Sequence, residues 1–270
     1  PKEPYEIAHF VSVKDEEVIN MALAKQIPVV VSALMCENDP DAAMLNQKGE
    51  VPTLKPKALR ILNKVTLILV PTENGRAILK HSGVETPIRV LSEGVNLSRF
   101  DKTKTIETQI FPRYFRLEKG RKLIITTGEY SENAGLSDLV SIARKRPDAE
   151  FFYFGRKHRF LMPGKVKKIL RSAPKNCHFS DLVEDDVYRS ALMNADVYFL
   201  PGFTKAGTVT MLDAMAAQCQ IIAREEAVYS DMFVNKKDAY ICKSSIELEK
   251  KLGAYLDGNL EPTTEAAYAK

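Results

Sequence analysis

Short apolar runs alternate with amphipathic helical patterns along most of this chain. The apolar runs are rich in Val, Ile and Leu, which is typical of buried strands. Between these runs, apolar residues recur at the three- to four-residue spacing of a helix with one buried face. In the first part of the chain the pattern predicts strands at 6–12, 28–34, 66–72 and 86–95, and helices at 15–26, 54–65 and 73–83.

The alternation stops over residues 96–121, which are charged, contain Pro112 and predict a linker or domain hinge. It then resumes and continues almost to the last residue. The second part of the chain predicts strands at 122–128, 150–155, 176–180, 196–201, 219–223 and 238–242. Helices are predicted between them at 134–146, 164–173, 184–195, 208–218, 226–235 and 245–257.

Alternating strands and helices predict an α/β fold in which parallel sheets are covered by helices on both faces. We therefore expect a pair of Rossmann-like, doubly wound domains: a partial domain at 1–100, a hinge at 101–121 and a second domain at 122–270. The first domain has few strands for this fold, and residues 261–270 begin a new helix. Both features predict a chain that lacks parts of a longer protein at its two ends.

The composition is that of a globular protein, with 45% apolar and 27% charged residues. No apolar run reaches the about 18–20 residues that span a bilayer, and the sequence shows no secretory leader. The net charge of +4 is modest and no RNA-binding motif is present, so nucleic acid is not an expected partner. The four cysteines (Cys36, Cys177, Cys219 and Cys242) lack the spacing of metal ligands, which favours a reduced, cytoplasmic protein without a metal site.

The stretch PGFTKAGTVTMLD, which ends at Asp213, contains the clearest candidate site. It joins a predicted strand to a predicted helix, and ligands of doubly wound sheets bind beyond the carboxyl ends of strands. Gly207 lets the backbone approach a ligand closely, and the free amides of Thr208, Val209 and Thr210 can bind an anion. Asp213 lies about one and a half helical turns further on, where it can reach a sugar hydroxyl. The alternative is a simple turn at Gly207 and a solvated or capping acid at Asp213.

The longer stretch 194–223, NADVYFLPGFTKAGTVTMLDAMAAQCQIIA, resembles the nucleotide-sugar motif of the GT-B glycosyltransferases of family 4. In that family an apolar strand leads to a glutamate, a Gly-Phe-Gly turn, a second glutamate eight positions after the first, and Ala-Met-Ala before the next strand. Further segments follow the order of the family, at 61–101, 122–140, 149–155 and 175–201. The resemblance covers the chain from about residue 6 to its end and implies the GT-B fold.

The resemblance also implies roles for four positions, and three of these have lost or reversed the expected charge. In the family, an arginine and a lysine stabilise the diphosphate that leaves the sugar; Glu129 and Ala134 stand at these positions here. Lys205 replaces the glutamate that contacts the donor sugar, and Asp213 replaces the glutamate that holds the ribose. Either Lys205 compensates for the missing cations, with Glu129 holding it in place, or the site has decayed.

The activity implied by the resemblance is transfer of a sugar, with retention, from a nucleotide sugar such as a UDP-sugar to a cell-envelope, lipid or polysaccharide acceptor. The donor is a substrate, and neither a cofactor nor a metal is required. The candidate catalytic residues are Lys205, Asp213 and Glu129, and the candidate donor-binding residues are Gly128, Gly155, Arg156, Gly207, Thr208, Val209 and Asp213. The alternative is a degenerate, non-catalytic GT-B subunit that acts as a protein-interaction partner, including for another copy of itself, or as a membrane-surface module.

A basic segment at 156–175 contains eight Lys or Arg residues and no acid. Within it, GKVKKILRS has helical spacing with Val166, Ile169 and Leu170 on one side. A basic helix with an apolar face can lie on an anionic membrane, so peripheral binding at the inner membrane face is one interpretation. A solvated surface, or cations that line a diphosphate pocket, is the other.

Overall fold

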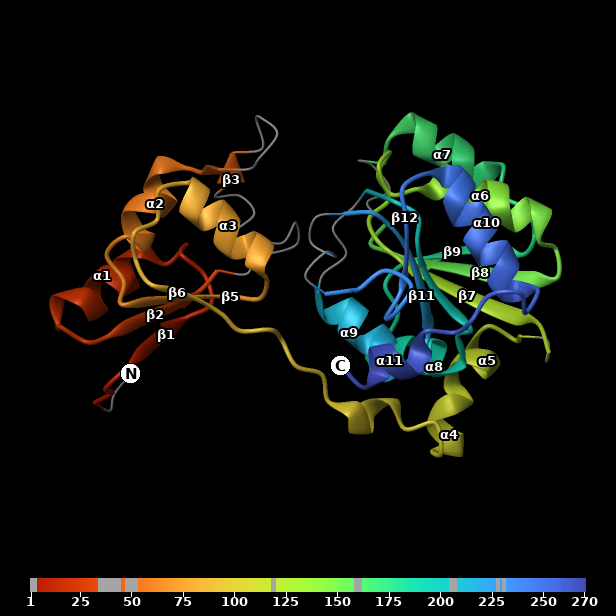
Figure 1. Cartoon of the computed structure of the whole chain (residues 1–270), viewed down its shortest axis with the longest axis horizontal. Coiled ribbons are helices and arrows are strands. Elements are labelled where there is room, and N and C mark those ends of the chain that lie inside the picture. Colours follow the sequence, from red (N-terminus) through yellow and green to blue (C-terminus); the bar gives the residue numbers. More distant parts are fainter. Residues whose placement is uncertain are drawn as a thin grey trace. The chain divides into compact units, whose positions relative to one another are not determined.

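The computed structural model describes residues 4–33, 45–46, 53–117, 120–157, 162–203, 208–226, 229 and 232–270. The chain divides into two compact units, Pro1–Glu93 and Gly94–Lys270, and each is built on a parallel sheet (Figure 1). The predicted fold class, two doubly wound α/β domains, is therefore confirmed. The limits predicted for the hinge at 101–121 stay a prediction.

The first unit contains a four-stranded parallel sheet in the order β1-β2-β5-β6. Its strands and helices are β1 (Ala8–Phe10), α1 (Glu16–Ala24), β2 (Val29–Ser32), α2 (Pro56–Leu62), β5 (Leu67–Val70), α3 (Glu73–His81) and β6 (Ile88–Val90). A short antiparallel pair, β3 (Leu45–Asn46) and β4 (Thr53–Leu54), precedes α2. The apolar sides of these elements share one core.

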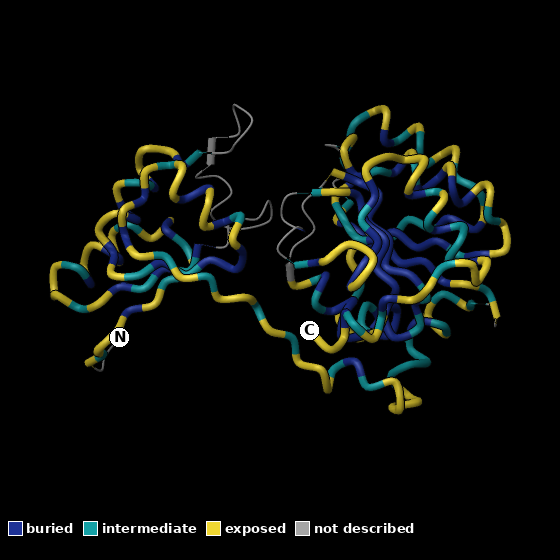
Figure 2. Tube along the Cα trace, viewed as in Figure 1, coloured by how far each residue is buried: buried dark blue, intermediate teal, exposed yellow. Residues whose placement is uncertain are grey.

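The second unit contains a six-stranded parallel sheet in the order β12-β11-β10-β7-β8-β9. The strands are β7 (Lys122–Thr127), β8 (Ala149–Phe154), β9 (Cys177–Ser180), β10 (Val197–Leu200), β11 (Gln220–Arg224) and β12 (Tyr240–Cys242). The central strands are buried along their length because helices cover both faces (Figure 2). Each of these strands starts within three residues of its predicted position.

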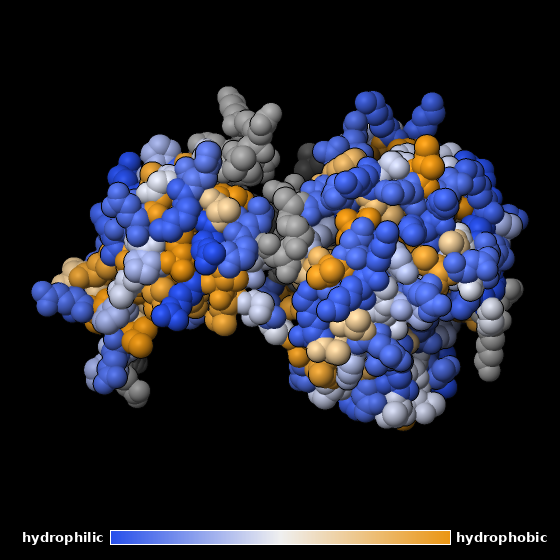
Figure 3. All heavy atoms as spheres, viewed as in Figure 1, coloured by the Kyte–Doolittle hydropathy of each residue, from blue (hydrophilic) through white to orange (hydrophobic). Residues whose placement is uncertain are grey.

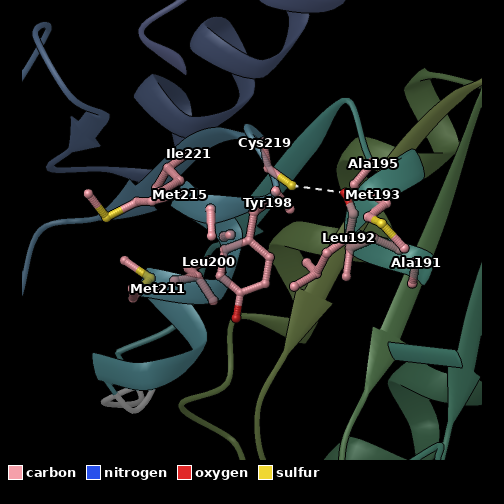
Figure 4. Packing of buried hydrophobic residues seen from close by; sticks show 14 of the residues in the cluster. Ala191, Leu192, Met193, Ala195, Tyr198, Leu200, Met211, Met215, Cys219 and Ile221 are labelled. Carbon is pink, nitrogen blue, oxygen red and sulfur yellow. Dashed lines mark hydrogen bonds between the residues drawn. The ribbon is translucent and has the colours of Figure 1, made fainter. Parts of the chain in front are cut away.

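Helices α6 (Leu136–Lys145), α7 (Gly164–Arg171) and α10 (Ser245–Leu256) contribute to the core on one face of this sheet. Helices α5 (Ile110–Tyr114), α8 (Asp185–Asn194), α9 (Thr208–Ala216) and α11 (Thr264–Tyr268) contribute to the core on the other face. Figure 4 shows this second core, where Tyr198 and Leu200 of β10 lie against Met211 and Met215 of α9. The two cores fix α9 and α6 on opposite sides of the sheet.

The three cysteines among the described residues are free and buried. Burial raises the thiol pKa of Cys177 and of Cys219 to about 12, and that of Cys242 to about 11. The thiol of Cys219 donates a hydrogen bond of 3.2 Å to the carbonyl of Leu192 (Figure 4). These thiols belong to the core, as their apolar sequence context predicts.

The segment predicted as a hinge contains helical structure that packs on the second unit. A 3-10 turn, η2 (Leu97–Phe100), and two short helices, α4 (Thr105–Thr108) and α5, contact α8. Phe111 of α5 is fully buried, and its amide donates a hydrogen bond of 2.9 Å to the hydroxyl of Ser190. These helices could not be predicted from the charged sequence of this segment, because they are too short to show a helical period.

The helix predicted at 226–235 lies partly outside the described residues, at 227–228 and 230–231. Tyr229 has 3-10 helical geometry, while 232–234 are not helical and Asn235 forms a β-bridge with Ala239. The amides of Met232 and Phe233 both donate to the carbonyl of Tyr229.

The surface of the second unit that faces the viewer in Figure 3 is mostly hydrophilic, with scattered apolar side chains. Among the described helices, none combines the length and the apolar character that crossing a membrane requires.

Candidate functional site

The strand order of the second unit creates a topological switch point between β7 and β10. The chain runs outward from β7 through β8 to β9, and then returns to place β10 on the other side of β7. The connection after β7 leads to α6 on one face, and the connection after β10 leads to α9 on the other. Ligands of doubly wound sheets bind where two neighbouring connections diverge in this way.

The connections after β7 and β8 touch each other through two predicted site residues, Gly128 and Gly155. A Cβ atom on Gly155 would lie 2.0 Å from the carbonyl oxygen of Gly128. The amide of Gly128 donates to the carbonyl of Phe154 at 3.1 Å, which holds the two backbones at this spacing. The sequence indicated these glycines as part of the site, and the structure places them side by side at the carboxyl edge of the sheet.

The connections after β7 and β10 also meet backbone to backbone. A Cβ atom on Gly202 would lie 2.5 Å from the carbonyl carbon of Ala134 and 2.7 Å from the carbonyl oxygen of Asn133. The amide of Phe203 donates a 2.8 Å hydrogen bond to the same oxygen of Asn133. The start of the β10–α9 connection is therefore fixed against the β7–α6 connection.

Helix α9 begins at Thr208, as the sequence predicts. The first amides of an α-helix have no partner within the helix, and the amides of Thr208, Val209 and Thr210 stay the predicted anion site. The side chain of Val209 is exposed at this end. Lys205 and Gly207, which precede the helix, lie outside the described residues.

Asp213 lies in α9 and is 7% exposed. Burial raises the pKa of its carboxyl group, the nearby cation Arg99 lowers it, and the carboxylate of Asp185 raises it. Arg99 in turn forms an ion pair of 2.5 Å with Asp185. The alternative of a solvated Asp213 is therefore wrong, since this carboxyl group is buried at the junction of α9, η2 and α8.

A hydroxyl cluster lies between the carboxyl ends of β7 and β10 and the start of α9. The phenol of Tyr198 hydrogen-bonds the hydroxyl of Thr127 and that of Thr210. Tyr198 is fully buried (Figure 4). This cluster anchors the first turn of α9 to both strands of the switch point.

The remaining predicted residues follow β7 and β8. The side chain of Glu129 is exposed, while its carbonyl oxygen accepts a 2.7 Å hydrogen bond from the phenol of Tyr153. Ala134 is 3% exposed and its methyl group belongs to the core. Arg156 follows Gly155 and is exposed. Gly128, Glu129, Gly155 and Arg156 thus share the ends of two adjacent strands, whereas Asp213 lies on the α9 face.

A buried ion pair beside this site was not predicted from the sequence. The guanidinium group of Arg224, at the end of β11, bonds the Asp138 carboxylate of α6 at 2.5 Å. The same group donates to the carbonyl of Pro201 at 2.7 Å and lies 4.6 Å from the centre of the Phe203 ring. A charged residue directly after an apolar strand was the available signal, but its partners are far away in the sequence.

The basic segment places its apolar side toward the core. In α7, Val166 is buried, and Ile169 and Leu170 pack against the same core as α6. The ammonium group of Lys165 pairs with Glu132 at 3.1 Å. The apolar face of α7 is therefore occupied, and only its cations remain for a surface partner.

The family described as "Glycosyl transferases group 1" matches residues 108–269. The "processive diacylglycerol alpha-glucosyltransferase" of Acholeplasma laidlawii is 23% identical over 269 residues, which are 99% of this chain and 80% of that protein. The "alpha-galactosylglucosyldiacylglycerol synthase" of Streptococcus pneumoniae is 24% identical over 119 residues, 42% of this chain and 31% of that protein.

Among solved structures, Anabaena Alr3699/HepE in complex with UDP and glucose superposes with a TM-score of 0.77 at 12% identity. The superposition covers 98% of this chain and 72% of the Anabaena chain, and it confirms the GT-B fold. The family match spans more than half of the chain and includes the switch point with α9. This chain belongs to the group 1 glycosyltransferases.

Proposed function

We propose that this glycosyltransferase moves a sugar from a UDP-sugar to a lipid acceptor of the cell envelope, with retention at the anomeric carbon. The observation that carries the donor part is the first turn of α9, which lies at the switch point with Asp213 in the same helix. The solved relative from Anabaena is described in complex with UDP, and the two curated relatives are named for diacylglycerol lipids.

In the proposed reaction, the sugar–oxygen bond to the diphosphate breaks with its electron pair leaving on the diphosphate oxygen. The hydroxyl oxygen of the acceptor bonds the anomeric carbon, and its proton passes to the leaving diphosphate. Negative charge develops on the leaving diphosphate, and donors that already point at it lower the barrier. The amides of Thr208, Val209 and Thr210 fill this role without any side-chain charge. Asp213 accepts hydrogen bonds from the ribose hydroxyls, and Lys205 supplies the cation that positions 129 and 134 lack.

A second candidate function is that of a non-catalytic subunit, which has a degenerate donor site and binds a protein partner without transferring sugar. The observation that favours it is the pair of positions where the family resemblance implies cations. An exposed carboxylate stands at Glu129, and a core methyl group stands at Ala134. Loss of one such electrostatic contact costs on the order of 10²–10³ in rate, so two uncompensated losses would leave little turnover.

Calorimetric titration with UDP tests the proposal directly. The wild-type protein is expected to bind UDP, and Asp213→Ala is expected to weaken binding by about ten- to a hundredfold. This range corresponds to the about 1.5–3 kcal/mol of a hydrogen bond to a charged group. No binding by the wild type at millimolar UDP would reject the proposed donor.

The same titration of Lys205→Glu distinguishes a functional donor site from a degenerate one. If Lys205 neutralises the diphosphate, the acidic substitution weakens UDP binding by more than Asp213→Ala does. Stronger binding by Lys205→Glu than by the wild type would instead support the non-catalytic subunit with a degenerate donor site.

The affinity for UDP-glucose is expected to fall on acidification, and to begin falling at a higher pH than the ordinary pKa of an aspartate would give. Burial raises the pKa of Asp213 above its ordinary value of 3.8, so this carboxylate takes up a proton at a higher pH than an exposed aspartate does. Protonation removes acceptor capacity for the ribose. UDP-glucose is the appropriate ligand because the terminal phosphate of UDP itself titrates near pH 6.

Asp213→Asn is the control for this pH dependence. It should bind more weakly than the wild type at about pH 8, with an affinity that changes less on acidification. It should also unfold at a higher temperature at about pH 8, because the wild type must then hold a buried charge that the folded state disfavours. A wild-type affinity that falls on acidification no more than that of Asp213→Asn would contradict the role of Asp213.

A further inference from the structure

We propose that Arg224 is a positioning residue of the donor site, because it holds Pro201 and Phe203, which follow β10 directly, in fixed positions. This inference rests on the proposed function for its ligand, and its geometry stands on contacts of the described residues alone. Among the described residues, Arg224 forms no hydrogen bond with the first turn of α9, so it acts through Pro201 and Phe203.

The contacts of Arg224 use its guanidinium group in several directions. Its Nε donates to the Pro201 carbonyl at 2.7 Å. One terminal nitrogen, Nη2, donates to Asp138 at 2.5 Å and to the hydroxyl of Ser245 at 3.0 Å. That hydroxyl donates to the same Asp138 oxygen at 2.8 Å. The arginine therefore joins β11, the first turn of α6 and the first residue of α10 to the connection that carries the donor site.

Phe203 receives the second contact. Its ring is 58% exposed, although the Arg224 guanidinium lies 4.6 Å from the ring centre and is itself buried. The amide of Phe203 is held at the same time by the carbonyl of Asn133. An exposed ring ordinarily changes rotamer freely, whereas this residue is held at its backbone and on one face of its ring.

Stability alone is a weak reason for this arrangement. Burying an ion pair costs desolvation free energy, and a well-packed apolar substitute is often as stable. What the pair adds is a fixed geometry, since the planar guanidinium fork bonds a carbonyl and a carboxylate in set directions. That geometry fixes Pro201 and Phe203 immediately before the residues that lead into α9.

Arg146 provides a matched control. Its guanidinium group is also largely buried and pairs with Asp148 at 2.7 Å and Asp257 at 2.9 Å, and it donates to the carbonyl of Gly253. It follows α6 and precedes β8, so it lies at the amino-terminal edge of the sheet, away from the switch point. Arg146→Met removes a similar set of contacts without touching the connection after β10.

The experiment compares the wild type, Arg224→Met, Arg224→Lys and Arg146→Met by UDP titration and by hydrogen exchange of the peptide that contains Phe203, well below their unfolding temperatures. We expect Arg224→Met to weaken UDP binding at least tenfold and to speed exchange at Phe203 at least tenfold. Arg224→Lys, which keeps the charge but not the fork, should recover only part of both. Arg146→Met should match the wild type in both measurements, even where its unfolding temperature falls as far.

Unchanged UDP affinity and unchanged exchange at Phe203 in folded Arg224→Met would overturn the proposal. Where Arg224→Met does not fold, Phe203→Ala decides, because the exposed ring can be removed without opening the core. Weaker UDP binding in Phe203→Ala supports the proposal, and an unchanged affinity rejects it. A wild type that binds no UDP would reject the proposed function, and the exchange measurement would still decide whether Arg224 holds the connection.

Discussion

Gly155→Ala is expected to destabilise the second unit by about 3 kcal/mol and to reduce UDP binding of the remaining folded protein at least tenfold. The added Cβ atom would lie 2.0 Å from the carbonyl oxygen of Gly128, where ordinary contact begins near 3.4 Å. The obstacle is backbone, so no side chain can rotate away, and overpacking of this kind costs about 1–3 kcal/mol or more. Because the connection after β7 must move, its position beside Gly202 is lost as well.

Urea denaturation and UDP titration measure the two effects. Gly164→Ala is the control, since a Cβ atom at this helical glycine meets nothing within 4 Å. It should leave binding unchanged and raise stability slightly, by up to about 1 kcal/mol, because alanine loses less backbone entropy on folding. Equal stability of Gly155→Ala and the wild type would show that the two connections can separate without cost.

Asn176→Ala is expected to cost about 3 kcal/mol of stability while leaving UDP affinity unchanged. The Asn176 amide nitrogen, on a side chain that is nearly fully buried, donates to the carbonyls of Ala143, Arg146 and Ala149 at 3.0, 2.8 and 2.9 Å. Each of these carbonyls keeps another donor, so each lost hydrogen bond costs about 0.5–1.5 kcal/mol, and the space left by the side chain adds to the sum. These bonds join the end of α6 to the start of β8, at the edge of the sheet opposite the candidate site.

The free energy of unfolding, again from urea denaturation, tests this expectation. The exposed Asn259 offers the comparison, and Asn259→Ala should stay within about 0.5 kcal/mol of the wild type. If Asn176→Ala lost UDP binding while still folded, the separation between the structural edge and the ligand edge of this sheet would be wrong.

Much of the fold follows from the sequence because a buried parallel strand needs a continuous apolar run. Runs such as the one that forms β10 could be recognised without knowledge of their neighbours. Helices α4 and α5 could not, because each is only about one turn long and gains its stability from α8. The buried Phe111 and its hydrogen bond to Ser190 depend on residues far apart in the chain.

The candidate site was predictable in part, for a similar reason. The start of α9 at Thr208 and the glycines at 128 and 155 have local signatures in the sequence. Two properties depend on tertiary packing instead: the burial of Asp213 and the contact of Arg224 with Asp138. The latter two residues are 86 positions apart, and no short-range pattern marks one as the partner of the other.

The three buried thiols of the second unit can report separately on local opening of different parts of its sheet. Cys177 and Cys242 begin and end the two outermost strands, β9 and β12, while Cys219 lies directly before β11. A thiol reacts as its thiolate, so each of these groups must first reach water before an alkylating reagent can modify it. The modification rate of each cysteine, followed by mass spectrometry, would therefore report how often its part of the sheet opens without global unfolding. Cys177 and Cys242 report on the two outermost strands, and Cys219 reports on the interior.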